Sequence, residues 1–231
     1  MCAYAHRLFR WAAGRGIIEF NPAADLPKPG SETKRDRVLS DAELGAVWRG
    51  AGELGWPFGT AIKLFILTGT RREEIGRLQW SEINADTAAI NLQGARTKNA
   101  QPHVIPLSTD VSSLLIDAPR IGVFTTNGKT PVSGWSRAKD RLDKIAKIDA
   151  WRLHDLRRTV ATGLQKLGVG LQVVESILGH VSGSRAGVVG IYQRHTCDAE
   201  KRAALEAWGT HVMALVEGRE AGKVVPMRGK V

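Results

Sequence analysis

The sequence predicts an α+β fold that is mainly α-helical and contains a small antiparallel β-sheet. Apolar residues recur at helical spacing in the first third of the chain and again from residue 134 to about 216. Between these stretches, residues 88–92 and 103–107 are short apolar runs typical of strands, and the loop 94–99 connects them like a hairpin. Because strands joined by a short loop pair antiparallel, we expect one small sheet within an otherwise helical chain.

The first 35 residues predict one helix followed by a linker. Tyr4, Leu8 and Trp11 recur at helical spacing, and two glycines then end that pattern. The Pro-Lys-Pro-Gly run at 27–30 has the composition of a linker. The apolar stripe of this helix needs a partner surface, which is either the rest of the chain or another domain.

The part of the chain before the predicted strands contains three further helices. Ser40 and Glu43 have the spacing of a capping box, which marks the start of the first. A second apolar stripe follows at helical spacing, and a third, short helix carries Ile75 and Leu78. The main domain is therefore expected to open with three helices.

Helices also fill the part after the strands. Residues 108–116 are expected to be helical, and apolar residues from Leu156 to Leu167 mark another helix. The next helix ends at Gly179, a residue type that commonly terminates helices. A last amphipathic helix carries Trp208, so the second half of the chain is mainly helical.

The composition favours a partner of opposite charge and excludes several protein classes. Of the 231 residues, 33 are Lys or Arg and 23 are Asp or Glu, which gives a formal charge of +10 at pH 7. Such a cation attracts polyanions, and nucleic acid is the commonest large one, although an unrelated basic enzyme would show the same charge. The two cysteines exclude a disulfide framework and fit a reducing cytosol. No apolar run is long enough to span a bilayer, and the first residues lack the apolar core of a signal peptide.

A few polar residues stand where they could carry chemistry. His154 and Arg157 are three positions apart at the start of a predicted helix, so both face one side. The free N–H groups of the helix start would add to an anion site suited to phosphate, although a solvated basic face fits the same pattern. Arg71 lies between two predicted helices, His180 just after a helix end, and Tyr192 after a glycine-rich stretch. Each of these three residues, taken singly, also fits a structural role.

The combination and order of these residues resemble the catalytic domain of the tyrosine recombinase (phage integrase) family, from residue 36 to about residue 208. The first arginine motif matches Thr-Gly-Thr-Arg71, the hairpin lysine matches Lys98, and the His-x-x-Arg box matches His154 to Arg157. The site residues that the resemblance implies are, in chain order, Arg71, Glu74, Lys98, His154, Arg157, His180 and Tyr192. The last two are 12 positions apart, which is more than is usual in the family, and the extra residues include glycines.

The resemblance implies a site-specific DNA recombinase that needs no metal, ATP or other cofactor. Tyr192 would attack a backbone phosphate, form a 3′-phosphotyrosyl link and release a 5′-hydroxyl. The two arginines would stabilise the charge of the transition state, and the two histidines would donate hydrogen bonds to the same phosphate. Lys98 would protonate the leaving oxygen, His154 would help to deprotonate the tyrosine, and Glu74 would support the arginines.

The resemblance also implies domains, partners and a location. Residues 1–35 would be the last helix and linker of a missing N-terminal domain that clamps the core DNA. Residues 36–216 would be the catalytic domain, and residues 217–231 a mobile tail. The partner would be double-stranded DNA at an attachment core site. The protein would form a homotetramer on this DNA and would be a monomer when free, and no membrane would be involved. The protein would be encoded by a bacterium or phage and would be located in the cytoplasm, associated with the nucleoid. Its activity would be to integrate or excise a phage or other mobile element.

Several alternatives remain open from the sequence. Residues 161–178 have the helix–turn–helix pattern of a non-catalytic DNA-binding regulator, although the second helix offers few side chains that read bases. A type IB topoisomerase would use the same tyrosine chemistry, and a truncated relic would retain the motifs without activity. A metal site of His154, His180 and His195 is disfavoured because no metallohydrolase spacing accompanies these histidines. The last helix packs either in its own core or against a neighbouring protomer.

Overall fold

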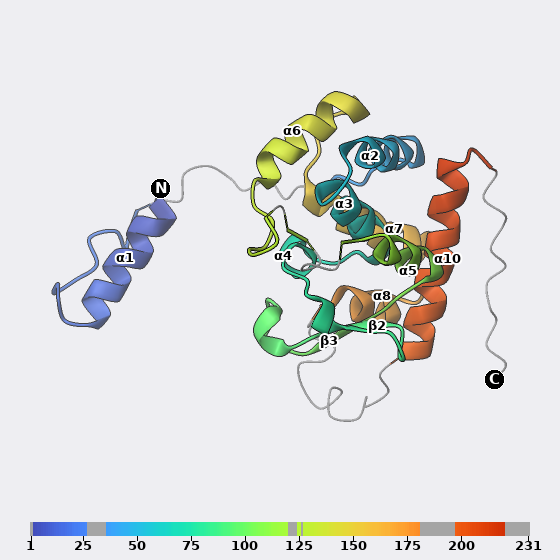
Figure 1. The fold of residues 1–231 in the computed structure, drawn as a ribbon. Helices are drawn as coiled ribbons and strands as arrows, with labels where there is room; N and C mark the ends of the chain where they lie inside the picture. Colours follow the sequence, from blue (N-terminus) through green and yellow to red (C-terminus); the bar gives the residue numbers. More distant parts are fainter. Residues whose placement is uncertain (1, 27–35, 120–123, 126, 181–196, 220–231) are drawn as a thin grey trace. The chain divides into compact units, whose positions relative to one another are not determined.

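The structure, a computed structural model, divides into two compact units, residues 1–36 and 37–231 (Figure 1). It describes residues 2–26, 36–119, 124–125, 127–180 and 197–219. The expected nucleophile Tyr192, most of the expected linker and the expected tail from residue 220 lie outside the described residues.

The first unit contains the expected N-terminal helix, α1 (Cys2–Gly14). A hydrogen bond of 3.0 Å from His6 Nδ1 to the carbonyl oxygen of Ala23 ties the segment after the helix back to it. The apolar stripe of the helix is exposed, most of all Tyr4, which is 81% exposed. The helix is therefore formed as predicted.

The second unit opens with two helices that the sequence predicts. Helix α2 (Asp41–Leu54) begins at Ser40, and the capping box is confirmed. Ser40 Oγ accepts a hydrogen bond of 3.3 Å from the Glu43 backbone, and Glu43 Oε2 accepts one of 2.8 Å from the Ser40 backbone. Helix α3 (Phe58–Thr68) is almost wholly buried and ends at Gly69, whose left-handed backbone terminates it.

A three-stranded antiparallel sheet follows, in the order β1-β2-β3. The two predicted strands are present as β2 (Ala89–Leu92) and β3 (His103–Pro106), with Ile90 paired to Ile105. The strand β1 (Ile83–Asn84) was not predicted, because two residues are too short to show an alternating pattern. Short 3₁₀ helices lie at Trp80–Glu82 and at Gly94–Arg96, the latter within the hairpin loop.

The remaining helices confirm the helical prediction except in one detail. They are α4 (Arg72–Gly76), α5 (Thr109–Ile116), α6 (Trp135–Ala146), α7 (Leu153–Lys166), α8 (Leu171–Leu178) and α10 (Asp198–Val216). The prediction that the short third helix carries Leu78 is wrong, because α4 ends at Gly76; Leu78 is nevertheless buried. Within the described residues, no helix combines the length and the apolar character needed to cross a bilayer.

Helix α10 packs into the core of its own chain, which is the first of the two arrangements that the sequence allows. It contacts α2, α3, α5, α7, α8 and β3 (Figure 1). Trp208 is 2% exposed, and its indole N–H donates a hydrogen bond of 2.7 Å to the carbonyl oxygen of Ile66 in α3. A Cβ at Gly163 of α7 would lie 2.2 Å from the Trp208 ring, so the glycine makes room for it. The last helix therefore joins the two helical parts of the domain.

Candidate active site

The turn between α3 and α4 presents Arg71. Gly69 has a φ of +64°, and a Cβ there would lie 2.8 Å from Leu178 Cδ2, so the turn lies directly against the end of α8. Arg71 follows as the residue that caps α4. The backbone of this turn thus brings the first arginine motif next to the Leu-Gly-His segment, although more than 100 residues separate them in the sequence.

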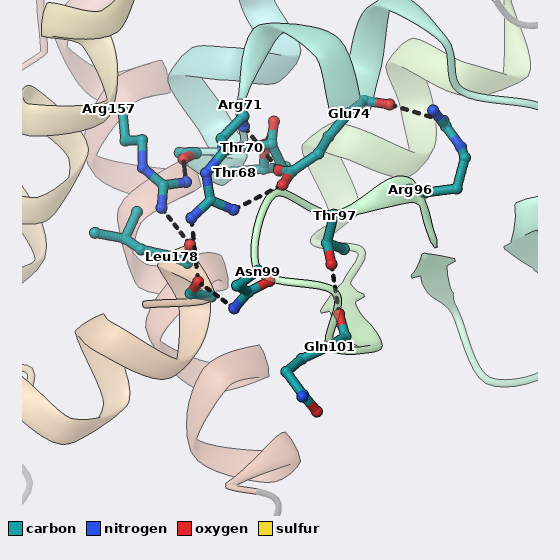
Figure 2. Close-up of polar contacts among 12 residues, drawn as sticks. Thr68, Thr70, Arg71, Glu74, Arg96, Thr97, Asn99, Gln101, Arg157 and Leu178 are labelled. Atoms are coloured by element: carbon teal, nitrogen blue, oxygen red, sulfur yellow. Dashed lines mark hydrogen bonds and ion pairs between the residues drawn. The ribbon is translucent and has the colours of Figure 1, made fainter. Parts of the chain in front are cut away.

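Arg71 is held from two sides (Figure 2). Its Nη1 atom donates a hydrogen bond of 2.7 Å to Glu74 Oε1, and its backbone N–H donates one of 2.9 Å to Glu74 Oε2. Its Nη2 atom donates to the carbonyl oxygen of Gly179 at 3.2 Å. Glu74 is 1% exposed, so a buried carboxylate fixes the direction of a partly exposed guanidinium.

Arg157 reaches the same place from the first turns of α7 (Figure 2). Its Nη1 atom donates a hydrogen bond of 2.7 Å to the carbonyl oxygen of Gly69, and its Nη2 atom donates to that of Leu178. Burial, and then the positive charge of Arg71, lowers the pKa of Arg157 to about 10, which leaves it charged at neutral pH. The two positively charged guanidinium groups repel each other, and an anion bound between them would offset this repulsion.

The two expected histidines lie within electrostatic reach of these arginines. Burial, and then the charges of Arg158 and Arg157, lowers the pKa of His154. Burial, and then the charges of Arg157 and Arg71, lowers the pKa of His180. Both imidazoles are therefore neutral at neutral pH, so each can donate one hydrogen bond and accept another.

The hairpin loop between β2 and β3 presents Lys98. The Thr97 hydroxyl donates a hydrogen bond of 2.7 Å to the carbonyl oxygen of Gln101 (Figure 2) and lies 3.0 Å from that of Gly94, which closes the loop on itself. Asn99 Nδ2 donates to the carbonyl oxygen of Gly179 at 3.4 Å, the same oxygen that Arg71 contacts. Lys98 itself is exposed at the tip of this braced loop.

The arginine of this loop, Arg96, belongs to none of the sequence motifs and anchors the loop at its base. Arg96 Nε donates to Glu82 Oε1 at 2.7 Å, and Arg96 Nη2 donates to the carbonyl oxygens of Glu74 at 3.3 Å and Arg77 at 2.8 Å (Figure 2). The hairpin is therefore tied to α4, the helix that Arg71 begins. Nothing in the local spacing of Arg96 distinguishes it from a solvated residue.

A pocket of about 710 Å³ brings most of the expected site residues together. Its lining comprises Phe65, Thr70, Arg71, Arg72, Glu73, Glu74, Arg96, Thr97, Lys98, Trp135, Ser136, Lys139, Trp151, Arg152, Leu153, His154 and Arg157. Expected site residues from α4, the hairpin and α7 thus face one space. His180 lies in the adjoining segment after α8, and Tyr192 is outside the described residues.

The pocket is built to receive an anion with several oxygen atoms. Guanidinium groups bind phosphate oxygens in pairs, and the ammonium and imidazole groups add further donors. In the described part of the chain, no three His, Cys, Asp or Glu residues are grouped so that they could hold a metal ion. Sequence reasoning missed Trp135, Lys139 and Trp151, because these lining residues belong to no motif.

Known proteins resemble this chain over most of its length. The model of the phage integrase family matches residues 54–197, more than half of the chain. Prophage integrase IntZ of Escherichia coli (strain K12) is 26% identical over 229 residues, covering 91% of this chain and 54% of the relative. Prophage integrase IntF of the same strain is 29% identical over 201 residues, covering 77% of this chain and 42% of the relative. The chain thus spans about half the length of these relatives.

Solved structures share the fold. A lambda integrase dimer bound to a COC′ core site superposes with a TM-score of 0.60 at 21% identity, covering 78% of this chain and 70% of that chain. A lambda integrase tetramer bound to a Holliday junction gives a TM-score of 0.59 at 20% identity, covering 78% of this chain and 57% of that chain. The predicted integrase catalytic fold is confirmed. With the family model matched over more than half of its residues, the chain belongs to the phage integrase family of tyrosine recombinases.

Proposed function

We propose that this chain is the catalytic part of a site-specific DNA recombinase that cleaves and rejoins DNA through a 3′-phosphotyrosyl link to Tyr192. The observation that carries the proposal is the convergence of Arg71 and Arg157 on one pocket that Lys98 and His154 also line. These groups come from three separate elements, so their convergence reflects the fold and not proximity in the sequence.

The proposed reaction is a transesterification in which no phosphodiester energy is lost. Tyr192 Oη attacks the phosphorus, the bond to the 5′-oxygen breaks, and the reverse reaction with another 5′-hydroxyl rejoins the strands. Negative charge on the non-bridging oxygens rises in the transition state, where the two fixed guanidinium groups stabilise it most.

Proton transfer would fall to the remaining side chains. His154 is neutral and can accept the proton of the tyrosine, and Lys98 can donate one to the leaving 5′-oxygen. His180 would donate a hydrogen bond to the phosphate. Glu74 would orient Arg71 through its two hydrogen bonds and would not itself meet the phosphate.

The same proposal extends to the domains and partners. Residues 1–35 would end a DNA-clamping domain and link it to the catalytic domain at 36–216, with residues 217–231 as a tail. Two facts support this division: the chain separates into compact units after Asp36, and it spans only about half of its relatives. The lambda integrase structures are bound to DNA as a dimer and a tetramer, which supports DNA as the partner and a tetramer as the working assembly. Its place of action would be the cytoplasm, on the DNA of the host.

Covalent trapping tests the proposed chemistry. The chain is incubated with a pool of duplexes that carry randomised core sequences and a nick, so that cleavage releases a short fragment and cannot reverse. Denaturing electrophoresis should reveal a protein–DNA adduct, and sequencing of the trapped DNA gives the preferred core. Tyr192→Phe should bind the pool as the wild type does and give no adduct, because the ring lacks the attacking oxygen.

Each other outcome has a defined meaning. An adduct that persists in Tyr192→Phe would show that another residue is the nucleophile. Binding without an adduct in the wild type would favour a DNA-binding regulator and contradict the proposed activity of this chain.

A further inference from the structure

One wall of the pocket is lined by residues to which the proposed reaction gives no role. These residues are Phe65, Trp135, Ser136, Lys139, Trp151, Arg152 and Leu153. They come from α3, from the first turns of α6, and from the start of α7 with the two residues before it. A volume of about 710 Å³ is that of a site for a whole small molecule and exceeds what one phosphate group would fill.

Lys139 stands out on this wall because its ammonium group is held in place. Its Nζ atom donates to both carboxylate oxygens of Asp143 at 2.6 Å and lies 4.1 Å from the centre of the Trp151 ring. The Trp151 indole N–H donates to the same carboxylate at 2.9 Å, and Trp151 is 5% exposed. A lysine side chain is ordinarily flexible, so a carboxylate and a ring that fix its end create a preorganised cation.

Helix α6 is also fixed relative to the catalytic arginines. The ring of Trp135, its first residue, packs edge-on against Phe58 and lies 5.6 Å from the ring of Phe65, centre to centre. A Cβ at Gly76 would lie 2.9 Å from the Trp135 ring, so α6 begins directly against α4, the helix that Arg71 caps. Lys139 is one turn further along α6 and therefore has a set position with respect to Arg71.

The charges around the pocket favour more than one anionic group. Seven lining residues are Lys or Arg and two are Glu. A DNA strand carries one phosphate per nucleotide, and hydroxyl, ammonium and guanidinium groups are the side chains that most often bind such phosphates. The apolar rings and Leu153 beside Lys139 suit the deoxyribose between two phosphates.

We propose that Lys139, with Ser136 and Arg152 beside it, binds the DNA backbone phosphate next to the one that Arg71 and Arg157 bind. This inference rests on the proposed function, because it takes the pocket to hold a DNA strand. An ammonium group has three donors, so the Asp143 carboxylate leaves one for the phosphate. Asp143 and Trp151 would act as positioning residues for Lys139.

Neutral-phosphate scanning tests this contact. The core duplex found by covalent trapping is made in a series in which a methylphosphonate replaces one phosphate at a time around the cleaved position. Adduct formation and equilibrium binding are measured for the wild type, Lys139→Met and Lys139→Arg. Lys166→Met is the control, since Lys166 lies at the opposite end of α7 from His154 and does not line the pocket.

If Lys139 contacts a phosphate directly, loss of the lysine and loss of the charge on that one phosphate should not weaken binding additively. Lys139→Met should weaken binding about tenfold, as expected for one charge-assisted hydrogen bond partly offset by Asp143. The methylphosphonate at the contacted position should weaken wild-type binding by a similar factor and leave Lys139→Met unaffected. Lys139→Arg should restore most of the loss, and Lys166→Met should respond to each methylphosphonate as the wild type does.

The results separate this inference from the proposed function. In one outcome the wild type forms the Tyr192 adduct, but every methylphosphonate weakens the binding of Lys139→Met by the same factor as that of the wild type. The proposed Lys139 contact is then wrong, and the proposed function stands. If no adduct forms, the proposed function fails. The salt dependence of binding to any duplex then tests whether Lys139 contacts a phosphate. Loss of the phosphate contact should then reduce the slope of log K against log salt by about 0.9 in Lys139→Met. An unchanged slope would overturn the inference.

Discussion

At the scale of single residues, Glu74 shows how a buried charge can serve a site that it does not enter. It is 1% exposed and accepts two hydrogen bonds from Arg71. A carboxylate so deeply buried would be costly without a cationic partner, and the partner gains a fixed direction in return. The neighbouring Glu73 is exposed and pairs with the surface residues Arg72 and Arg77.

Substitution of these two glutamates separates orientation from surface charge. Glu74→Gln keeps the size of the side chain but removes the charge that aligns Arg71, so adduct formation should slow by about ten- to a hundredfold, the range of one misplaced transition-state contact. DNA binding should change little, because most of the binding comes from other phosphate contacts. Glu73→Gln is the matched control: it also removes one negative charge from the pocket lining but no hydrogen bond to Arg71, so it should not slow adduct formation. Equal slowing in both variants, measured with the trapping duplex, would contradict the orienting role.

Residue motifs predicted part of the candidate site and could not predict the rest. Arg71, Lys98 and His154 were found from their order in the chain, and the structure places them around one pocket. Arg96 and Lys139 were missed, because their significance depends on contacts outside their own elements, with the backbone of α4 and with the Trp151 ring, that local spacing does not contain. The sequence therefore predicts the candidate catalytic residues better than it predicts the residues that position them.

At the scale of elements, the turn between α3 and α4 connects the two arginine motifs. The carbonyl oxygen of Gly69 accepts a hydrogen bond from Arg157, and the next turn residues lead into Arg71. Gly69 has a φ of +64°, and a Cβ there would lie within 3.1 Å of Val160 as well as 2.8 Å from Leu178. The glycine is needed both for its backbone conformation and for the close approach of α7 and α8.

Replacement of this glycine tests the two requirements separately. Gly69→Ala should destabilise the domain by about 2 kcal/mol or more, because a clash adds to the strain of a left-handed residue. Gly134→Ala is the control, since Gly134 also has a left-handed backbone but has open space around its Cβ position; it should cost about 1 kcal/mol. Urea unfolding of both variants measures the difference. Equal losses would show that the approach of Leu178 and Val160 is not tight.

Element prediction succeeded where a pattern spans several turns and failed where it does not. The capping box at Ser40 and the glycine stop at Gly179 have local causes, and both helix ends are found where predicted. Strand β1 and the end of α4 are set by packing on neighbouring elements, because segments of two to five residues carry too little periodicity.

At the scale of the whole molecule, the catalytic domain depends on α10 to close its core. This helix follows the part of the chain that carries Tyr192, and it contacts helices from both halves of the domain as well as β3. Lys201 Nζ donates to the carbonyl oxygen of Val104 at 3.1 Å, and Arg202 donates to carbonyl oxygens beside β2, among them that of Thr87 at 2.8 Å. These bonds fix the start of α10 to the sheet that also carries the Lys98 loop.

Trp208 is the centre of this packing, and its removal should therefore affect the whole domain at once. Trp208→Ala would leave a large cavity beside Gly163 and free the carbonyl oxygen of Ile66, so it should reduce the free energy of unfolding by about 3–5 kcal/mol. That is a large fraction of the 5–15 kcal/mol typical of a domain, so the urea transition should move to much lower concentration and remain a single step. Trp11→Ala is the matched control: its indole is 52% exposed on α1, and its loss should leave the transition of the catalytic domain unchanged. If Trp208→Ala instead unfolds in two steps, with only part of the helical signal lost at low urea, α10 is an appendage and not the closing element of the core.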